Sequence, residues 1–107
     1  MCNHKLLYHN KFGKISQCGC SSRVQLSFGN FVLGLSEAEL DVLKDYIPPL
    51  YEEESKQAAP ADERNIFLSP SINHLMLAFS LEELEGLMEL IYQAAIVLEI
   101  QNIINED

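Results

Sequence analysis

Hydrophobic and polar residues alternate between Arg23 and Leu35, which is the pattern of two half-buried β-strands. Gly29 and Asn30 both tolerate positive φ angles, as a two-residue turn requires. A turn at this dipeptide places three apolar cross-strand pairs on one face: Phe28 with Phe31, Leu26 with Leu33, and Val24 with Leu35. A slip of one residue would turn one strand's apolar set outward, so the sequence predicts a β-hairpin of defined register.

A helix is predicted directly after this hairpin. Ser36 is followed three residues later by Glu39, the spacing of a capping box in which each residue satisfies an N–H group of the first turn. Apolar residues then recur at helical spacing at Leu40, Leu43 and Ile47. We expect Pro48 and Pro49 to end the helix, because proline lacks an N–H and disfavours helix in the residue before it. The polar, acidic residues 51–63 are predicted to form a linker or mobile loop.

The same order of elements returns in the second half of the chain. Residues 65–68 and 75–79 are predicted strands joined by a turn at residues 70–73, and Ser80 with Glu83 forms a second capping box. The two copies align at an offset of 44 residues. A single ββα unit cannot cover its own apolar face, so two copies are expected to share one core. We therefore predict an α+β fold: two ββα repeats forming an antiparallel sheet of four to five strands, with two helices on one face.

This prediction treats residues 1–107 as a single domain. It contains an N-terminal Cys/His segment with an edge strand at Gly13–Cys18 (1–22), a first repeat (23–47), an acidic linker (48–64) and a second repeat with an extended C-terminal helix (65–107). The side chains expected to face the core are Val24, Leu26, Phe28, Phe31, Leu33, Leu35, Leu40, Leu43, Leu75, Leu77, Phe79, Leu84, Leu87 and Ile91.

The second helix is predicted to continue from about Leu81 to Ile104, a length of roughly 35 Å at 1.5 Å per residue. Its last half is apolar on nearly every side, through Ala94, Ala95, Ile96, Val97, Leu98, Ile100, Ile103 and Ile104. Such a helix should be buried. We expect a homodimer through this helix, because two-fold pairing is the commonest way to bury such a patch. In the alternative, the helix end folds over the second face of the sheet, where Val32, Phe67, Met76 and Ala78 leave apolar surface.

Composition and charge narrow the classes of function. Of the 107 residues, 48% are hydrophobic, which predicts a packed core rather than a disordered chain. The net charge of −9 argues against a nucleic-acid binder, which needs a basic surface. Residues 1–36 carry +4 and residues 37–107 carry −13. No stretch reaches about 18 consecutive apolar residues, so no membrane span is expected. Three cysteines and the absence of a signal-peptide pattern favour a reducing, cytoplasmic location.

Four residues supply the candidate chemistry. Cys2, His4, Cys18 and Cys20 offer thiolate and imidazole ligands that suit a tetrahedral zinc ion, and His9 is a substitute for His4. The spacing of one residue within each pair is tighter than in zinc knuckles. In the alternatives, Cys18 and Cys20 are small side chains in an ordinary Gly/Ser turn, or they form a redox pair. The chain lacks a phosphate-binding loop, a nucleophile elbow and a His-Glu-x-x-His helix, which favours a non-enzymatic role without deciding it.

The opening Met1-Cys2-x-x-Lys5, the Cys18/Cys20 pair and the strand ending in Phe28-Gly29-Asn30 resemble a family of small bacterial proteins known only as a domain of unknown function. The resemblance covers about the first 45 residues. It implies a small intracellular bacterial protein with paired N-terminal cysteines, and it implies no activity. The sequence as a whole favours a non-enzymatic interaction or regulatory module that acts as a homo-oligomer, with a protein partner and a structural zinc as candidates. The alternative is a thiol-redox or metal-dependent protein that uses Cys18 and Cys20.

Overall fold

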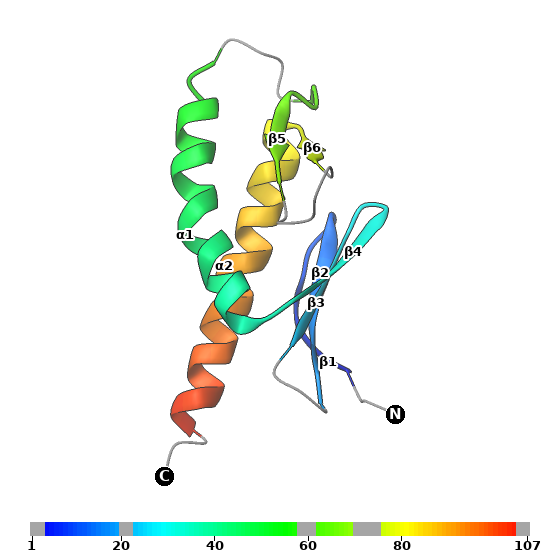
Figure 1. Cartoon of the computed structure of the whole chain (residues 1–107), viewed down its shortest axis with the longest axis vertical. Helices are drawn as coiled ribbons and strands as arrows, with labels where there is room; N and C mark the ends of the chain where they lie inside the picture. The colour runs from blue at the N-terminus through cyan, green and yellow to red at the C-terminus, as the bar shows by residue number, and fades with distance from the viewer. Residues whose placement is uncertain (1–3, 20–22, 58–61, 70–75, 105–107) are drawn as a thin grey trace.

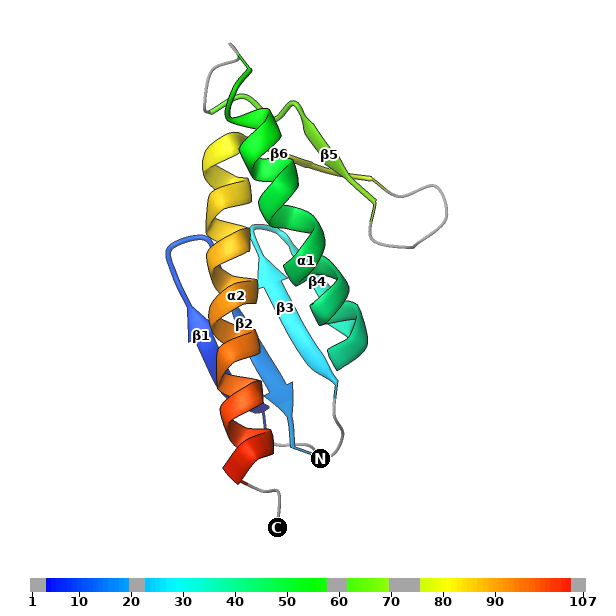
Figure 2. The same ribbon diagram turned by 90° about the vertical axis from the view of Figure 1, so that its left-hand side faces the viewer.

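The computed structural model describes residues 4–19, 23–57, 62–69 and 76–104. Its elements are β1 (His4–His9), β2 (Gly13–Cys18), β3 (Val24–Phe28), β4 (Phe31–Leu35), α1 (Glu37–Glu54), β5 (Ile66–Leu68), β6 (Leu77–Phe79) and α2 (Leu81–Ile104). Strands β1 to β4 form an antiparallel sheet in chain order, and β5 and β6 form a separate antiparallel pair. The two helices run antiparallel along one face of the larger sheet (Figures 1 and 2). The predicted α+β class is therefore confirmed.

The hairpin β3–β4 has the register that its hydrophobic alternation predicts. Phe28 pairs with Phe31, Leu26 with Leu33, and Val24 with Leu35. Gly29 provides the left-handed residue of the turn, with a φ of 57°. Of the six side chains, four are buried and those of Phe31 and Leu33 are half-buried. The alternation of apolar and polar residues is sufficient to predict this register, because only this register places all six apolar side chains on the core side of the hairpin.

The four strands of the larger sheet come from the first 35 residues rather than from two repeats. Strands β5 and β6 pair Ile66 with Phe79 and Leu68 with Leu77, but they do not join β4. The ββα order recurs in the chain, yet the two copies do not share one sheet. The predicted turn at 70–73 and the predicted core residue Leu75 lie outside the described residues. On its other side, the first hairpin is extended by β2 and then β1, which pair beside β3.

The strand Gly13–Cys18 was predicted at the sheet edge, but β2 lies inside the sheet because β1 pairs with its outer side. The sequence pattern did not predict strand β1, and the reason is physical. The pairing register shifts between Leu6 and Tyr8, which is the irregularity of a β-bulge. A bulge breaks the alternation of inward and outward residues: Leu7 is buried, and the next residue, Tyr8, is half-buried and reaches Glu89 of α2.

The prediction that Pro48 ends the first helix is wrong, because α1 continues through Pro48 and Pro49 to Glu54. Each proline removes one intrahelical hydrogen bond. Packing beyond the prolines compensates: Leu50 and Tyr51 contact the core. The Tyr51 hydroxyl also donates to Glu85 of α2 at 3.1 Å. The predicted linker therefore contains the last turn of α1.

Both predicted capping boxes are present. At α1, the Ser36 hydroxyl accepts from Glu39 N–H at 3.1 Å, and the Glu39 carboxylate accepts from Ser36 N–H at 2.8 Å. At α2, Ser80 and Glu83 make the same two bonds at 3.1 and 3.0 Å. Glu83 also accepts two hydrogen bonds from the Arg64 guanidinium, each at 2.9 Å. The start of α2 is thereby tied to the chain just before β5.

An aromatic cluster centred on Phe28 joins the two sheets. The Phe28 ring stacks on Phe12 of the β1–β2 turn at a centroid distance of 5.8 Å. It lies 5.8 Å from Phe31 and meets Phe79 of β6 edge-on at 5.6 Å. Such pairs contribute about 0.5–1.5 kcal/mol each beyond their burial. The small sheet is therefore attached to the large one through side chains, without shared strand pairing.

The β1–β2 turn is fixed to α2 at Gly86. A Cβ atom at this position would lie 2.2 Å from Cδ2 of Phe12, so only glycine admits the ring. The Asn10 side chain bridges the same contact: its Nδ2 donates to the Gly86 carbonyl at 3.1 Å, and its Oδ1 accepts from Phe12 N–H and Gly13 N–H. The turn and the helix thus hold each other by shape and by hydrogen bonds.

We predict that Gly86→Ala destabilises the fold by about 1–3 kcal/mol through overpacking, although alanine is the better helix former. Urea denaturation measures the change. Gly34→Ala is the matched control, because a Cβ there would meet only Arg23 Nη2 at 3.8 Å, an ordinary contact. The double variant Phe12→Ala/Gly86→Ala should lose less than the sum of its parts. Additive losses would contradict the proposed ring contact.

A second prediction concerns pH. Hydrogen bonds from Arg64 hold the pKa of Glu83 below its usual range. Ionised Glu83 therefore stabilises the folded state above its unfolded pKa of about 4.3, and this contribution is lost as the pH falls through the lower folded value. We expect Glu83→Gln to cost about 1 kcal/mol at pH 7, and the difference from the native chain to shrink toward pH 3. Glu82→Gln, at an exposed neighbouring site, is the control. A gap independent of pH would refute this account.

Candidate functional site

The second half of α2 carries an apolar stripe that faces solvent. Tyr92, Ile96, Ile100 and Ile103, here called the α2 stripe, follow one another at intervals of four, four and three residues. That spacing places them on one side of a helix. Ile96 is half-buried, while Tyr92, Ile100 and Ile103 are 57%, 51% and 64% exposed. Ile104 beside the stripe is 70% exposed. An exposed apolar cluster of this kind is typical of a surface that contacts another protein or a membrane.

The opposite side of α2 is already occupied. Leu84, Leu87, Leu90, Ile91, Ala94 and Leu98 are buried against the core. Because these residues and the stripe lie on opposite sides of the helix, a rotation of α2 that buried the stripe would expose the core residues. Among the described residues, the stripe therefore stays exposed while the other side of α2 is buried.

The alternative in which the helix end folds over the second face of the sheet is wrong. Helix α2 stays on the same face of the sheet as α1 throughout its length (Figures 1 and 2). Val32, Phe67 and Met76 accordingly remain 58–62% exposed. The reason is geometric: α2 runs straight from the small sheet past β1 and β2, and nothing in it breaks the helix.

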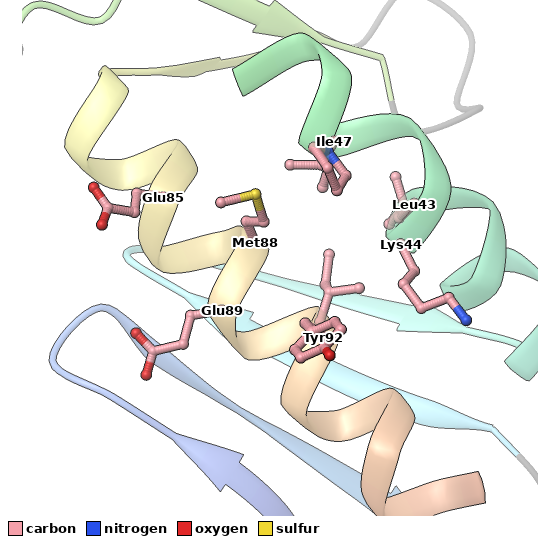
Figure 3. A pocket seen from close by; sticks show the side chains of 9 residues that line it. Leu43, Lys44, Ile47, Glu85, Met88, Glu89 and Tyr92 are labelled. Atoms are coloured by element: carbon pink, nitrogen blue, oxygen red, sulfur yellow. The ribbon is translucent and has the colours of Figure 1, made fainter. Parts of the chain in front are cut away.

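A groove of about 360 Å³ lies between α1 and α2 and leads to the stripe (Figure 3). Leu43 and Ile47 of α1 and Met88 of α2 form its apolar lining. Tyr92 lies at the end of the groove and belongs to the stripe, so the two features make one continuous surface. Charged residues are confined to its sides, with Lys44 on α1 and Glu85 and Glu89 on α2.

Two tyrosines engage these glutamates. Tyr8 of β1 donates its hydroxyl to Glu89, and Tyr51 of α1 donates to Glu85. The hydrogen bond to Glu89 raises the pKa of Tyr8. Burial, aided by Glu85, raises the pKa of Tyr51. Both phenols therefore stay protonated at neutral pH and act as donors that orient the carboxylates. This arrangement is structural in character and supplies no activated nucleophile.

The structure brings two of the four predicted zinc ligands together. His4 and Cys18 are direct cross-strand partners in β1 and β2. Cys18 is a half-buried free thiol and His4 is exposed. Cys2 and Cys20 lie outside the described residues. Within residues 4–19, 23–57, 62–69 and 76–104, no group of three or more His, Cys, Asp or Glu side chains is placed to hold a metal ion.

His9 does not substitute for His4. It pairs with Lys14 at the far end of β1. Position 14 is four residues from Cys18 along β2, or about 13 Å at 3.3 Å per residue. That separation exceeds the reach of a shared zinc ion, whose bonds to nitrogen and sulfur are about 2.0–2.3 Å. The predicted substitution is therefore wrong.

Helix α2 is also the described helix that is long and apolar enough to cross a bilayer, by length and composition alone. Of the 18-residue apolar stretch in this helix, 28% is buried inside the fold. The sequence criterion of consecutive apolar residues did not detect it because Glu89 and Glu99 interrupt the run. A core helix of a soluble protein can have the same length and composition.

Sequence reasoning missed Tyr92 and the two tyrosine–glutamate bonds. The signal for Tyr92 is present, since it lies four residues before Ile96 and continues the helical spacing. No sequence signal points to Tyr8 and Glu89, which are 81 residues apart and meet only because β1 packs on α2.

The model of a family described as a family of unknown function, DUF6686, matches residues 1–105. A family of unknown function, as the sequence resemblance implied, is therefore shown over nearly the whole chain. No curated protein and no solved structure matches the chain.

Proposed function

We propose that this chain, which belongs to the family of unknown function DUF6686, is a non-enzymatic interaction module that works as a two-fold homodimer joined through the α2 stripe. The observation that carries the proposal is the stripe itself. Its four apolar side chains lie on a helix whose opposite side is already buried in the hydrophobic core. A second copy presents the same stripe, so one surface serves both partners.

An antiparallel pairing of the two helices suits the positions of the stripe residues. With the two-fold axis near Leu98, Ile96 meets Ile100 of the partner subunit, and Tyr92 meets the partner's Ile103. Each aliphatic side chain gains about 1.5–3 kcal/mol when fully buried from water, and roughly half of that where it starts half-buried. The sum over both copies is what must outweigh the entropy of association. The stripe is thus suited to a dimer of moderate affinity.

The negative charge around the stripe should make the affinity of such a dimer depend on salt concentration. Helix α2 contains five glutamates and no lysine or arginine. Glu99 lies beside the stripe close to the proposed two-fold axis, so two copies bring their Glu99 carboxylates together. Added salt screens this repulsion and leaves apolar burial intact. The dimer should therefore tighten as the salt concentration rises.

We predict that sedimentation equilibrium at micromolar concentration shows a dimer that Ile100→Asp converts to a folded monomer. The charged side chain would be buried in the interface, whereas residue 100 is half-exposed in the monomer. The native dimer should strengthen between about 50 mM and 500 mM salt, a range over which the Debye length falls from above 10 Å toward 4 Å.

Val42→Asp is the matched control, because Val42 is an exposed apolar residue of α1 away from the stripe, and its substitution should leave the dimer intact. A native chain that stays monomeric across the concentration range contradicts the dimer. Loss of protein to neutral phosphatidylcholine vesicles, abolished by Ile100→Asp, would assign the stripe to a membrane instead.

A second proposal is a structural zinc ion held by Cys2, His4, Cys18 and Cys20. The cross-strand pairing of His4 with Cys18 supports it, because it sets an imidazole beside a thiol on the face of the sheet away from the helices. Cys2 and Cys20 are each two residues from this pair in the sequence. A thiol-redox role for Cys18 and Cys20 is the competing proposal.

Elemental analysis of the untagged protein should find one zinc per chain, and Cys18→Ser should abolish it because a tetrahedral site loses a thiolate. His9→Ala is the control and should retain the metal. Thiol titration with and without reductant provides the second measurement. A metal-free protein with a reversible disulfide would support the redox role, and one with three free thiols would contradict both proposals.

A further inference from the structure

We propose that the cleft between β4, α1 and the β5–β6 pair binds an extended polypeptide segment that adds to the free edge of β4 as a fifth strand. This β4 cleft has a volume of about 370 Å³, within the range of ligand sites. Its walls are apolar: Leu33 and Leu35 from β4, Val42 and Tyr46 from α1, and Leu68 and Leu77 from the small sheet. It lies apart from the α2 stripe and does not depend on the dimer.

The edge of β4 offers main-chain partners for such a strand. Strand β4 is the last in the sheet order, so no described strand pairs with its outer side. In a hairpin with a two-residue turn, the residues that flank the turn form a hydrogen-bonded pair, and hydrogen-bonded and non-bonded pairs then alternate. Phe31, Leu33 and Leu35 therefore bond to β3. The N–H and C=O groups of Val32 and Gly34 point outward, where the Gly34 carbonyl accepts a long bond of 3.4 Å from Arg23.

The β4 cleft would receive every second side chain of an added strand. Successive residues of a strand point to opposite faces, so every second residue of a segment beside β4 faces the helices. On that side it meets the cleft, whose inner wall includes the buried Leu26 and Phe79. At the outer rim, Val42 and Tyr46 are 65% and 52% exposed and lie one helical turn apart. The fitting ligand has apolar residues at alternate positions.

Charge adds a second requirement. Glu39 is the charged residue among those that line the cleft. Hydrogen bonding from the Ser36 backbone lowers the pKa of Glu39, so its carboxylate is ionised at neutral pH. Because Glu39 lies on the cleft side of the added strand, a basic residue at the cleft-facing position next to it would complement it, in keeping with the net charge of −9. The structure therefore favours an extended segment with apolar residues at alternate positions and one basic residue at the cleft-facing position beside Glu39.

The test uses a short peptide in which valine alternates with threonine and one terminal valine is replaced by lysine, with acetylated and amidated ends and a fluorescent label. Anisotropy of the full-length protein should show saturable binding. Two control peptides separate the mechanisms: one carries N-methyl groups on alternate backbone nitrogens, and one has the same composition with its valines grouped together. Binding should weaken at least about tenfold for both, because the first loses strand pairing and the second loses the alternation.

Two variants of the protein locate the site. Val32→Pro removes an outward N–H at a position where an edge strand tolerates proline, and Val42→Asp places a charge on the apolar rim. Each should weaken binding at least about tenfold while circular dichroism shows an unchanged fold. Val32→Thr and Phe67→Ser, an exposed site outside the cleft, should bind as the native chain does. Hydrogen exchange should slow at Val32 and Gly34 when the peptide binds.

Equal binding of the N-methylated and unmodified peptides would overturn strand addition. Absence of saturable binding to the alternating peptide would overturn the proposal altogether. Ile100→Asp, which targets the dimer, should leave peptide binding unchanged. The failure of one proposal is thereby distinguishable from the failure of the other.

Discussion

Burial of one side of α2 is the constraint on which the rest of the molecule depends. Residues spaced along the whole helix, from Leu84 to Leu98, are buried in the common core. Strands β1, β2 and β6 and helix α1 all pack against it. Hydrogen bonds from Tyr8, Asn10 and Tyr51 reach it from three different elements. This single helix organises both sheets, and its remaining apolar side is not covered by any of the described residues.

The separation of the two sheets follows from how they meet. Phe28 contacts Phe12, Phe31 and Phe79, so the small sheet is held by ring packing rather than by strand pairing. Ring contacts fix its position, and no described strand pairs with the outer edge of β4. An apolar cleft remains where a continuous sheet would have had a fifth strand. The interaction that joins the two halves thus also creates the surface proposed to bind a polypeptide segment.

Charge is divided between the two layers in a way that matters for both proposed surfaces. The strands β1 to β4 contain no acidic residue, while α1 and α2 carry most of the acids of the described chain. The α2 stripe and the rim of the β4 cleft therefore both lie beside carboxylates. Self-association has to overcome this charge, whereas a basic ligand would benefit from it. A two-fold dimer formed through the stripe would carry two such clefts, which links the proposals by geometry without making either depend on the other.

The sequence alone determined those features whose causes lie within a few residues. The register of β3–β4 follows from the alternation around Gly29, and both capping boxes follow from a serine and a glutamate three residues apart. The length of α2 and the apolar stripe from Ile96 onward also follow from helical spacing. The pairing of His4 with Cys18 was suggested only loosely, through their shared ligand chemistry.

Tertiary structure decided what depends on distant partners. Helix α1 continues through Pro48 because Leu50 and Tyr51 gain contacts with the core, an energy that no local rule includes. Strand β1 forms despite its bulge because β2 and α2 both receive it. The second hairpin repeats the hydrophobic pattern of the first but forms its own two-stranded sheet, which contacts the larger sheet through Phe79 and Phe28 and not through pairing with β4. Hydrophobic periodicity specifies which face of a helix or strand is buried. Which other element packs against that face depends on contacts between residues far apart in the sequence, and only the tertiary structure specifies them.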